Sequence, residues 1–147
     1  MATRSSISIK RGNKVTSIYC HWDGYLTNNG QILLDHYKST SKISKLIALG
    51  SISSLGKFVN PRKNTYHYKF NAFDDSMKKG YSKTNLPHTF DTPHRGVCNA
   101  YHRDRNETFE QYHSENFLPT QKVLQGFDYM WDNGLGCWFF RNYSTDC

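Results

Sequence analysis

Residues 6–22 have the sequence SISIKRGNKVTSIYCHW, which carries the strongest structural signal in the chain. Ile7 and Ile9 alternate with polar residues, as they do in a strand that buries one face. Residues 11–14, Arg-Gly-Asn-Lys, have the composition of a tight turn. A second strand follows from Val15 to Trp22. The stretch therefore predicts an N-terminal β-hairpin.

The C-terminal part of the chain shows the same pattern with aromatic residues. Phe127, Tyr129 and Trp131 alternate with polar or smaller residues, and residues 132–136, Asp-Asn-Gly-Leu-Gly, form a turn signal. Trp138 and Phe140 then alternate in the returning direction. These residues predict a second β-hairpin, with one aromatic face.

Two short helices are expected after the first hairpin, over residues 29–37 and residues 41–49, because each segment has apolar residues at helical spacing. Ser39 or Thr40 would cap the second helix, and Gly50 occupies a position where glycine often ends a helix. The two apolar stripes consist of Ile32, Leu33, Tyr37 and of Ile43, Leu46, Ile47.

The middle of the chain gives weaker signals. We expect a short turn at residues 52–55, a strand at residues 65–70, a long loop at residues 76–96 and a short strand at residues 97–101. Together these elements predict one α+β domain spanning residues 1–147. Its sheet would be mostly antiparallel, with hairpins at both ends of the chain and the two helices on one face.

Composition narrows the class of protein. Aromatic residues make up 15% of the 147 residues, which argues against intrinsic disorder. No window approaches the roughly 18 apolar residues of a membrane span, and residues 1–10 lack an apolar run. The four cysteines form no Cys-x-x-Cys pair, so reduced thiols are expected. We therefore expect a soluble intracellular protein with no membrane association.

The net charge is +7, from 19 Lys and Arg against 12 Asp and Glu. This excess favours an anionic partner, such as a small nucleotide, nucleic acid or an acidic host protein. The alternative is that the charge serves solubility alone, because the basic residues are spread along the chain. Basic residues between 57 and 83 are interleaved with aromatic ones, a composition that suits a nucleic-acid surface. A homo-oligomer is also compatible with this sequence.

The end of the second strand carries a polar group of residues. In an extended strand Tyr19, His21 and Asp23 face one side, while Cys20 and Trp22 face the other. An imidazole beside a carboxylate can bind a ligand or orient a proton. The structural alternative is a strand-end turn in which Asp23 bonds the local backbone and Trp22 is buried.

A second candidate segment is Tyr101-His102-Arg103-Asp104-Arg105-Asn106-Glu107. In an extended conformation Arg103 and Arg105 would project together, and a pair of guanidinium groups suits phosphate recognition. Tyr101 and His102 could stack on a base. The alternative is that neighbouring acids neutralise both arginines on a solvated surface.

Other chemistries are weaker. A zinc site could use Cys20 or His21 with Cys98 and His102, but adjacent strand residues point in opposite directions and paired ligand spacing is missing. A metal-free nuclease could pair His21 or His102 with Arg105 and Glu107. A His-Asn-His arrangement of His102, Asn106 and His113 lacks the usual hairpin and helix. No cofactor is expected.

Residues 17–25, SIYCHWDGY, resemble a family of small tailed-phage proteins of unknown role. The resemblance continues, in order, through about two thirds of the chain. It departs from the family at His102 and in residues 61–94. It implies a phage accessory protein, often of the counter-defence kind, in the cytoplasm of the infected host cell, and it implies no reaction. The further matching segments are residues 2–5, 33–37, 46–50, 53–56, 98–101, 103–107 and the C-terminal hairpin.

These observations favour a non-enzymatic accessory protein that binds or sequesters a host component. In one version a pocket captures a phosphate-bearing nucleotide, and in the other a basic aromatic face blocks a host protein or its nucleic acid. The alternatives are a small metal-independent nuclease or hydrolase, and a minor virion protein. The expected ligand-binding residues are Tyr19, His21, Trp22, Asp23, Tyr25, Tyr101, His102, Arg103, Arg105 and Glu107.

Overall fold

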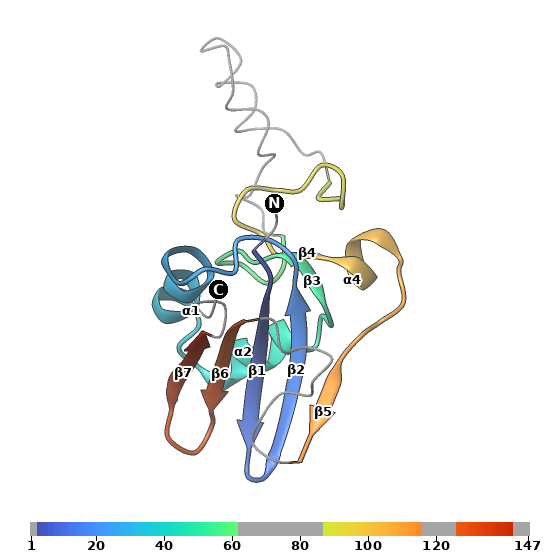
Figure 1. Cartoon of the computed structure of the whole chain (residues 1–147). Helices are drawn as coiled ribbons and strands as arrows, with labels where there is room; N and C mark the ends of the chain where they lie inside the picture. The colour runs from blue at the N-terminus through green and yellow to red at the C-terminus, as the bar shows by residue number, and fades with distance from the viewer. Residues whose placement is uncertain (1–2, 62–86, 116–125, 143–147) are drawn as a thin grey trace.

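The computed structural model describes residues 3–61, 87–115 and 126–142 (Figure 1). These residues form one seven-stranded sheet with a few short helices, so the expected α+β class is confirmed. The strands are β1 (Ser5–Arg11), β2 (Lys14–Cys20), β3 (Ile52–Ser54), β4 (Asn99–Ala100), β5 (Tyr112–Ser114), β6 (Phe127–Asp132) and β7 (Cys137–Asn142). The helices are the π-helix η1 (Leu26–Gly30), α1 (Gln31–His36), α2 (Thr40–Ile47) and α4 (Tyr101–Arg105).

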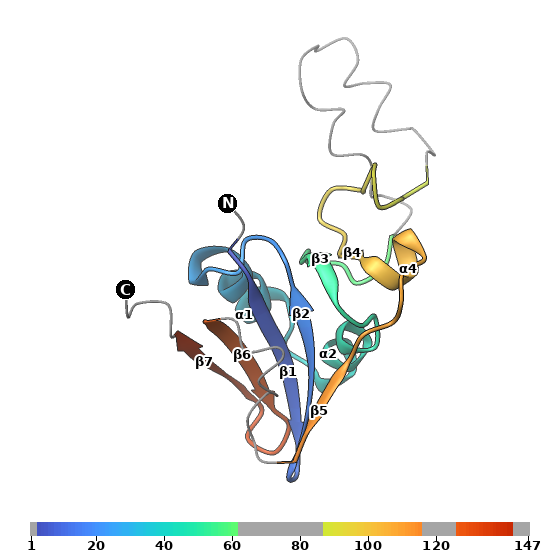
Figure 2. The same ribbon diagram turned by 45° about the vertical axis from the view of Figure 1, so that its right-hand side comes forward.

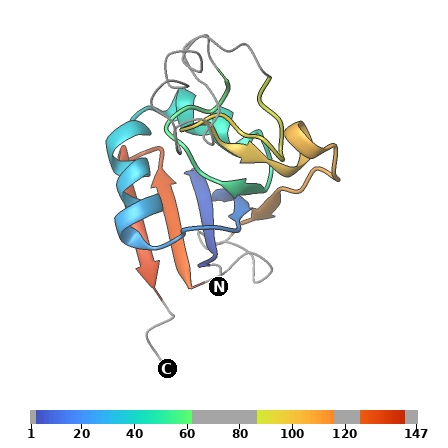
Figure 3. The same cartoon turned by 90° about the horizontal axis from the view of Figure 1, so that it is seen from above.

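The sheet is mixed. Its strand order is β4-β3-β2-β1-β6-β7, and β5 pairs with β2 outside this path. β1 runs parallel to β6, and β2 runs parallel to β3, while the other strand pairs are antiparallel. Seen from above, β3, β4 and α4 lie at the opposite end of the sheet from β7 (Figure 3).

One face of the sheet packs against α1 and α2, as the turned view shows (Figure 2). Ile7 and Ile9 of β1 belong to the same buried cluster as Leu33 of α1 and Ile43 of α2. Tyr37 is fully buried just after α1, and its hydroxyl donates to the carbonyl of Gly56 at 2.7 Å. Burial of these apolar side chains is the main source of stability for the layer.

The start of α2 is set by Ser39. Its side-chain oxygen accepts a hydrogen bond from the backbone N–H of Lys42 at 3.2 Å, so Ser39 is the N-cap and Thr40 is the first helical residue. Gly50 follows the helix with a φ of 78°, a conformation that glycine adopts without strain.

Replacing Ser39 with alanine should lower the free energy of unfolding by about 1 kcal/mol, because the helix loses the acceptor for one of its free N–H groups. Urea denaturation measures this change. Ser41→Ala is the matched control, since Ser41 is exposed inside the same helix and alanine is a good helix former there. Equal losses in the two variants would contradict the capping role.

The strand-end motif differs from expectation at Trp22. β2 ends at Cys20, and Trp22 is 44% exposed rather than buried. The chain leaves the strand because Asp23 adopts a left-handed φ of 57°. Gly24 then approaches the N-terminal segment closely, and its N–H donates to the carbonyl of Thr3 at 2.7 Å. The turn therefore serves packing against the start of β1.

Asn29 holds this turn from inside the protein. It is fully buried, and its amide nitrogen donates to the Cys20 sulfur at 3.3 Å and to the Trp22 carbonyl at 3.4 Å. A side-chain amide that bonds the backbone locally is a common way to stabilise such turns. Several residues of the SIYCHWDGY stretch therefore have a structural role in this turn.

Two further expectations are corrected. Residues 52–54 form strand β3, not a turn, because they pair in parallel with the end of β2. The segment from Tyr101 is helical, not extended: α4 spans Tyr101–Arg105 and ends at Asn106, which has a left-handed φ of 59°. Residues two apart in a helix lie on different sides, so Arg103 and Arg105 do not project together.

The strand expected at residues 65–70, most of the basic aromatic segment and part of the expected loop at 76–96 lie outside the described residues. Residues 87–96 are described, and they connect to β4 without regular secondary structure apart from isolated bridges.

The helices of this fold are short. Within residues 3–61, 87–115 and 126–142, every helix is too short or too polar to cross a bilayer.

Candidate functional site: a polar cleft beside the end of β2

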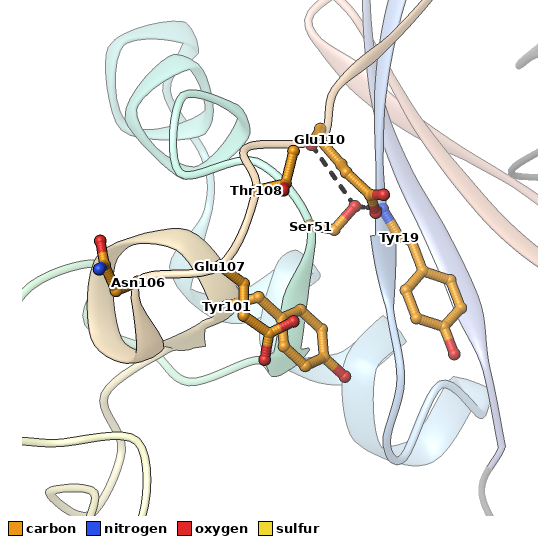
Figure 4. Close-up of a pocket in the computed structure, with 7 residues that line it drawn as sticks. All are labelled: Tyr19, Ser51, Tyr101, Asn106, Glu107, Thr108 and Glu110. Atoms are coloured by element: carbon orange, nitrogen blue, oxygen red, sulfur yellow. Dashed lines mark hydrogen bonds between the residues drawn. The ribbon is translucent and has the colours of Figure 1, made fainter.

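A cleft of about 520 Å³ lies between the end of β2 and the segment that begins with α4 (Figure 4). Tyr19 comes from β2 and Tyr101 from the start of α4, and Ser51 directly precedes β3. The remaining lining residues follow α4. The complete lining is Tyr19, Ser51, Tyr101, Asn106, Glu107, Thr108 and Glu110.

Ser51 joins the two walls of the cleft. Its hydroxyl accepts a hydrogen bond from the N–H of Tyr19 at 3.2 Å, and its own N–H donates to the carbonyl of Glu110 at 2.8 Å. Figure 4 shows Ser51 between Tyr19 and Glu110, with these groups drawn together. The segment after α4 is therefore linked to β2 through Ser51, by one backbone hydrogen bond and one hydrogen bond to the serine side chain.

The end of α4 turns Glu107 back toward the cleft. The N–H of Glu107 donates to the carbonyl of Tyr101 at 3.1 Å, and the His102 Nδ1 lies 2.9 Å from the Glu107 carbonyl oxygen. In Figure 4 the Glu107 carboxylate lies beside the Tyr101 ring. Asn106 makes this reversal possible because asparagine tolerates the left-handed conformation better than most residues.

Two phenols and two carboxylates give the cleft its chemistry. Burial raises the pKa of Tyr101, and the Ser53 hydroxyl offsets this only in part. Burial also raises the pKa of Tyr19, although the Arg4 guanidinium beside it acts in the opposite direction. Both phenols are therefore protonated at neutral pH and can donate hydrogen bonds. Glu107 and Glu110 supply acceptors.

Arg103 lies outside the cleft and anchors the structure around it. Its Nη1 donates to the carbonyl of Val59 at 2.6 Å, and its Nη2 donates to the carbonyl of Cys98 at 2.6 Å. Its Nε lies 2.8 Å from Asp104. The imidazole of His88 contacts the same carboxylate at 3.1 Å. We call Arg103, Asp104 and His88 the buried clasp.

The buried clasp shifts the titration of Asp104. Burial alone would raise the pKa of Asp104, but hydrogen bonds from His88, Arg103 and the Ala100 N–H, with the charge of Arg103, outweigh burial. The net result is a pKa well below the ordinary value. Because the folded-state pKa is the lower one, the carboxylate stabilises the fold above its ordinary pKa of about 4 and loses this effect as the pH falls.

Asp104→Asn should therefore cost more stability at pH 7 than at pH 3. The free energies of unfolding of wild type and variant, measured in urea at several pH values, should converge on acidification. The other carboxylates are present in both proteins, so their titration cancels in the difference. A difference that stays constant from pH 7 to pH 3 would contradict the low pKa.

The structure separates the expected site residues into three groups. Tyr19, Tyr101 and Glu107 line the cleft. His21 reaches it indirectly, because its Nδ1 lies 2.6 Å from the Tyr19 hydroxyl, and Trp22 packs edge-on against His21.

The other expected residues have positions that the fold itself explains. Asp23 and Tyr25 use their carbonyls to accept hydrogen bonds from residues 28–30. Arg105 forms an exposed ion pair with Glu107 at 3.0 Å and lies over the ring of Phe90. His102 bonds the Glu107 carbonyl, and Arg103 belongs to the buried clasp.

Sequence reasoning missed five residues at this site. Ser51, Asn106, Thr108 and Glu110 line the cleft, and Arg4 contacts Tyr19. Asn106 had a usable signal, since an asparagine after a short polar helix often ends it in the left-handed conformation. The others had none, because contacts between distant segments bring them together: the pairing of β3 with β2 places Ser51 beside Tyr19, and the pairing of β5 with β2 brings Glu110 there.

The cysteines and histidines do not form a metal centre in the part of the chain that the structure describes. Burial raises the pKa of the Cys20 thiol to about 12, and it also raises that of Cys98. His113 lies on β5 and pairs with Thr16, whereas His102 and Asn106 belong to α4 and its cap. The His-Asn-His arrangement, which the sequence already disfavoured, therefore finds no support among the described residues.

Comparison with known proteins gives no relative: no protein-family model, no curated protein and no solved structure matches this chain. The function of the cleft is therefore inferred from its geometry and chemistry.

Proposed function

We propose that this chain is a non-enzymatic binding protein that captures a small nucleotide in the cleft. Its role would be that of a phage accessory protein that sequesters a host component during infection, as in counter-defence. The proposal rests on one observation: two protonated phenols and two glutamates line the same hollow of about 520 Å³. Hollows of roughly 300–1,000 Å³ are typical of small-molecule sites.

The walls of the cleft suit a nucleoside. The rings of Tyr19 and Tyr101 offer flat surfaces on which a base can stack. The carboxylates of Glu107 and Glu110 accept hydrogen bonds, and ribose hydroxyls are suitable donors, as in dinucleotide-binding proteins where an acidic residue bonds the ribose. Ligands that offer several hydroxyl donors are thus favoured over ligands that offer only acceptors.

The phosphate of the nucleotide would lie away from the two carboxylates, because like charges repel. The cations near the cleft are Arg4, which lies against Tyr19, and Arg105, which is already paired with Glu107. His21 bonds Tyr19 from the same side of the strand. We place the phosphate at Arg4 and His21, and not at Arg103, whose donors are occupied inside the buried clasp.

Binding is favoured over hydrolysis by the partners of the two histidines in the expected site, His21 and His102. The imidazole of His21 bonds a phenol, and that of His102 bonds a backbone carbonyl. Within the described residues neither of these contacts involves a carboxylate, which is the group that would orient an imidazole as a general base.

The test is to denature the purified protein and analyse the released small molecules by mass spectrometry. We expect an intact nucleotide, and calorimetry with that nucleotide should show an affinity loss of at least about tenfold in Glu110→Gln, because a charged acceptor is removed. Glu115→Gln is the matched control, since Glu115 is an exposed acid outside the cleft.

Other outcomes would overturn the proposal in distinct ways. Turnover of the nucleotide that is lost in His21→Ala would support the hydrolase. A stable complex with a host protein or nucleic acid, without a small ligand, would support the blocking surface. Presence of the chain in purified phage particles would support a virion protein.

A further inference from the structure

A second hollow of about 320 Å³ opens beside α2, where β1, β2 and β5 come together. Its floor contains Ile9 of β1 and Ile47 of α2, both buried. We call this hollow the α2 groove. It shares no lining residue with the cleft, so a ligand bound here would be independent of the proposed function.

Hydrogen-bond donors from four elements converge on the α2 groove. Arg11 is the last residue of β1, and its Nη2 donates to the Ser44 hydroxyl of α2. On the adjoining strands the Thr16 hydroxyl lies 3.3 Å from the Nδ1 of His113, in agreement with the register that pairs Thr16 with His113. The contact at Nδ1 leaves the Nε2 of His113 for a ligand.

The charge of the α2 groove is opposite to that of the cleft. None of the described residues that line it is acidic, whereas the cleft contains two carboxylates. The guanidinium of Arg11 has five N–H donors, and with the described residues it makes one hydrogen bond, to Ser44. Lys14, the cross-strand partner of Arg11, adds another positive charge nearby.

We propose that the α2 groove binds a phosphoryl group. The guanidinium fork of Arg11, the Ser44 hydroxyl and the remaining proton of the Thr16–His113 pair supply donors that match the oxygens of a phosphate. The apolar floor strengthens these hydrogen bonds because it lowers the local dielectric constant. The phosphoryl group can come from a small phosphate ester or from a nucleic-acid backbone, which share this chemistry.

The first experiment is an NMR titration of the full chain with inorganic phosphate at constant ionic strength. The amide signals of Arg11, Thr16, Ser44 and His113 should shift together and saturate. Arg11→Gln should weaken binding at least about tenfold, because the charged donor is lost. Lys38→Gln removes the same charge from an exposed site outside the groove and should leave binding unchanged.

Further measurements identify the source of the phosphoryl group, and a second variant keeps the test valid if Arg11→Gln does not fold. If adenosine monophosphate binds the groove with an affinity similar to that of inorganic phosphate, the source is a small phosphate ester. If oligothymidylate binds more tightly and with a strong dependence on salt, the source is a nucleic-acid backbone. His113→Gln, at an exposed position, gives a second variant with an expected loss of affinity. Glu110→Gln should bind phosphate normally, which separates the groove from the cleft.

The proposal is overturned by shifts that do not saturate, or by equal weakening in Arg11→Gln and Lys38→Gln. Either result would mean that phosphate interacts only with the general positive charge of the protein.

Discussion

Arg103→Ala is expected to lower the free energy of unfolding by about 3 kcal/mol, because it removes the guanidinium, itself 24% exposed, from the buried carboxylate of Asp104. The variant leaves the Asp104 carboxylate, which is only 6% exposed, without its guanidinium. It also leaves the carbonyls of Val59 and Cys98 without the donors that tie residues 59 and 98 to α4. Urea denaturation followed by tryptophan fluorescence measures the loss.

Arg105→Ala is the matched control for this variant. Arg105 is two residues away and also pairs with an acid, but its side chain is 55% exposed. Such surface pairs contribute less than about 1 kcal/mol. Arg103→Lys should be nearly as damaging as Arg103→Ala, since one ammonium group cannot bond two carbonyls and a carboxylate in the fixed geometry of the guanidinium. Similar losses at positions 103 and 105 would show that the buried clasp is not a stabilising centre.

Gly56→Ala is expected to cost about 3 kcal/mol, at the upper end of the range for overpacking. A Cβ at this position would lie 2.3 Å from the carbonyl oxygen of Gly96 and 2.9 Å from the nitrogen of Val97. Both are backbone atoms, so no side-chain rotation relieves the clash. Residues 56–58 and 96–98 would have to separate, which breaks the hydrogen bond from Phe58 N–H to Gly96 O at 2.9 Å.

Gly12→Ala separates this effect from backbone strain. Gly12 has a φ of 62° in the turn between β1 and β2, but a Cβ there would meet nothing within 4 Å. Its cost should be only the roughly 1 kcal/mol of a left-handed alanine. If thermal unfolding shows Gly12→Ala to be as damaging as Gly56→Ala, the close approach of the two segments is not what glycine provides at position 56.

The core was largely predictable from local patterns. Ile7 and Ile9, and likewise Tyr129 and Trp131, are separated by one residue, which placed each pair on one face of its strand. All four side chains are buried. The apolar stripe of α2 and a capping residue at its start could also be predicted from the sequence, because helix period and capping involve residues a few positions apart. The structural alternative had Trp22 buried, but it is 44% exposed because β2 ends at Cys20 and Trp22 lies beyond the strand.

The cleft was predictable only in part. Tyr19, Tyr101 and Glu107 were selected as polar or aromatic residues in two candidate segments, and they do line it. The expected role of the arginines depended on an extended segment, and the segment is helical. Helix α4 has only five residues, too few to be stable from its own propensity. The contact of Asp104 with His88 and the bond from Arg103 to the Val59 carbonyl hold it, and these join α4 to residues 16 and 44 positions away.

The local patterns of the sequence were enough for the α+β class, for most of the core side chains and for the approximate start of α2, because these depend on interactions between near neighbours along the chain. Only the tertiary structure decided the parallel pairings of β1 with β6 and of β2 with β3. Those pairings join strands that are distant in sequence, so their energy depends on which faces are buried together. The pairing of β2 with β3 places Ser51 beside Tyr19, and the pairing of β2 with β5 brings Glu110 there, so these long-range contacts determine what the cleft can bind.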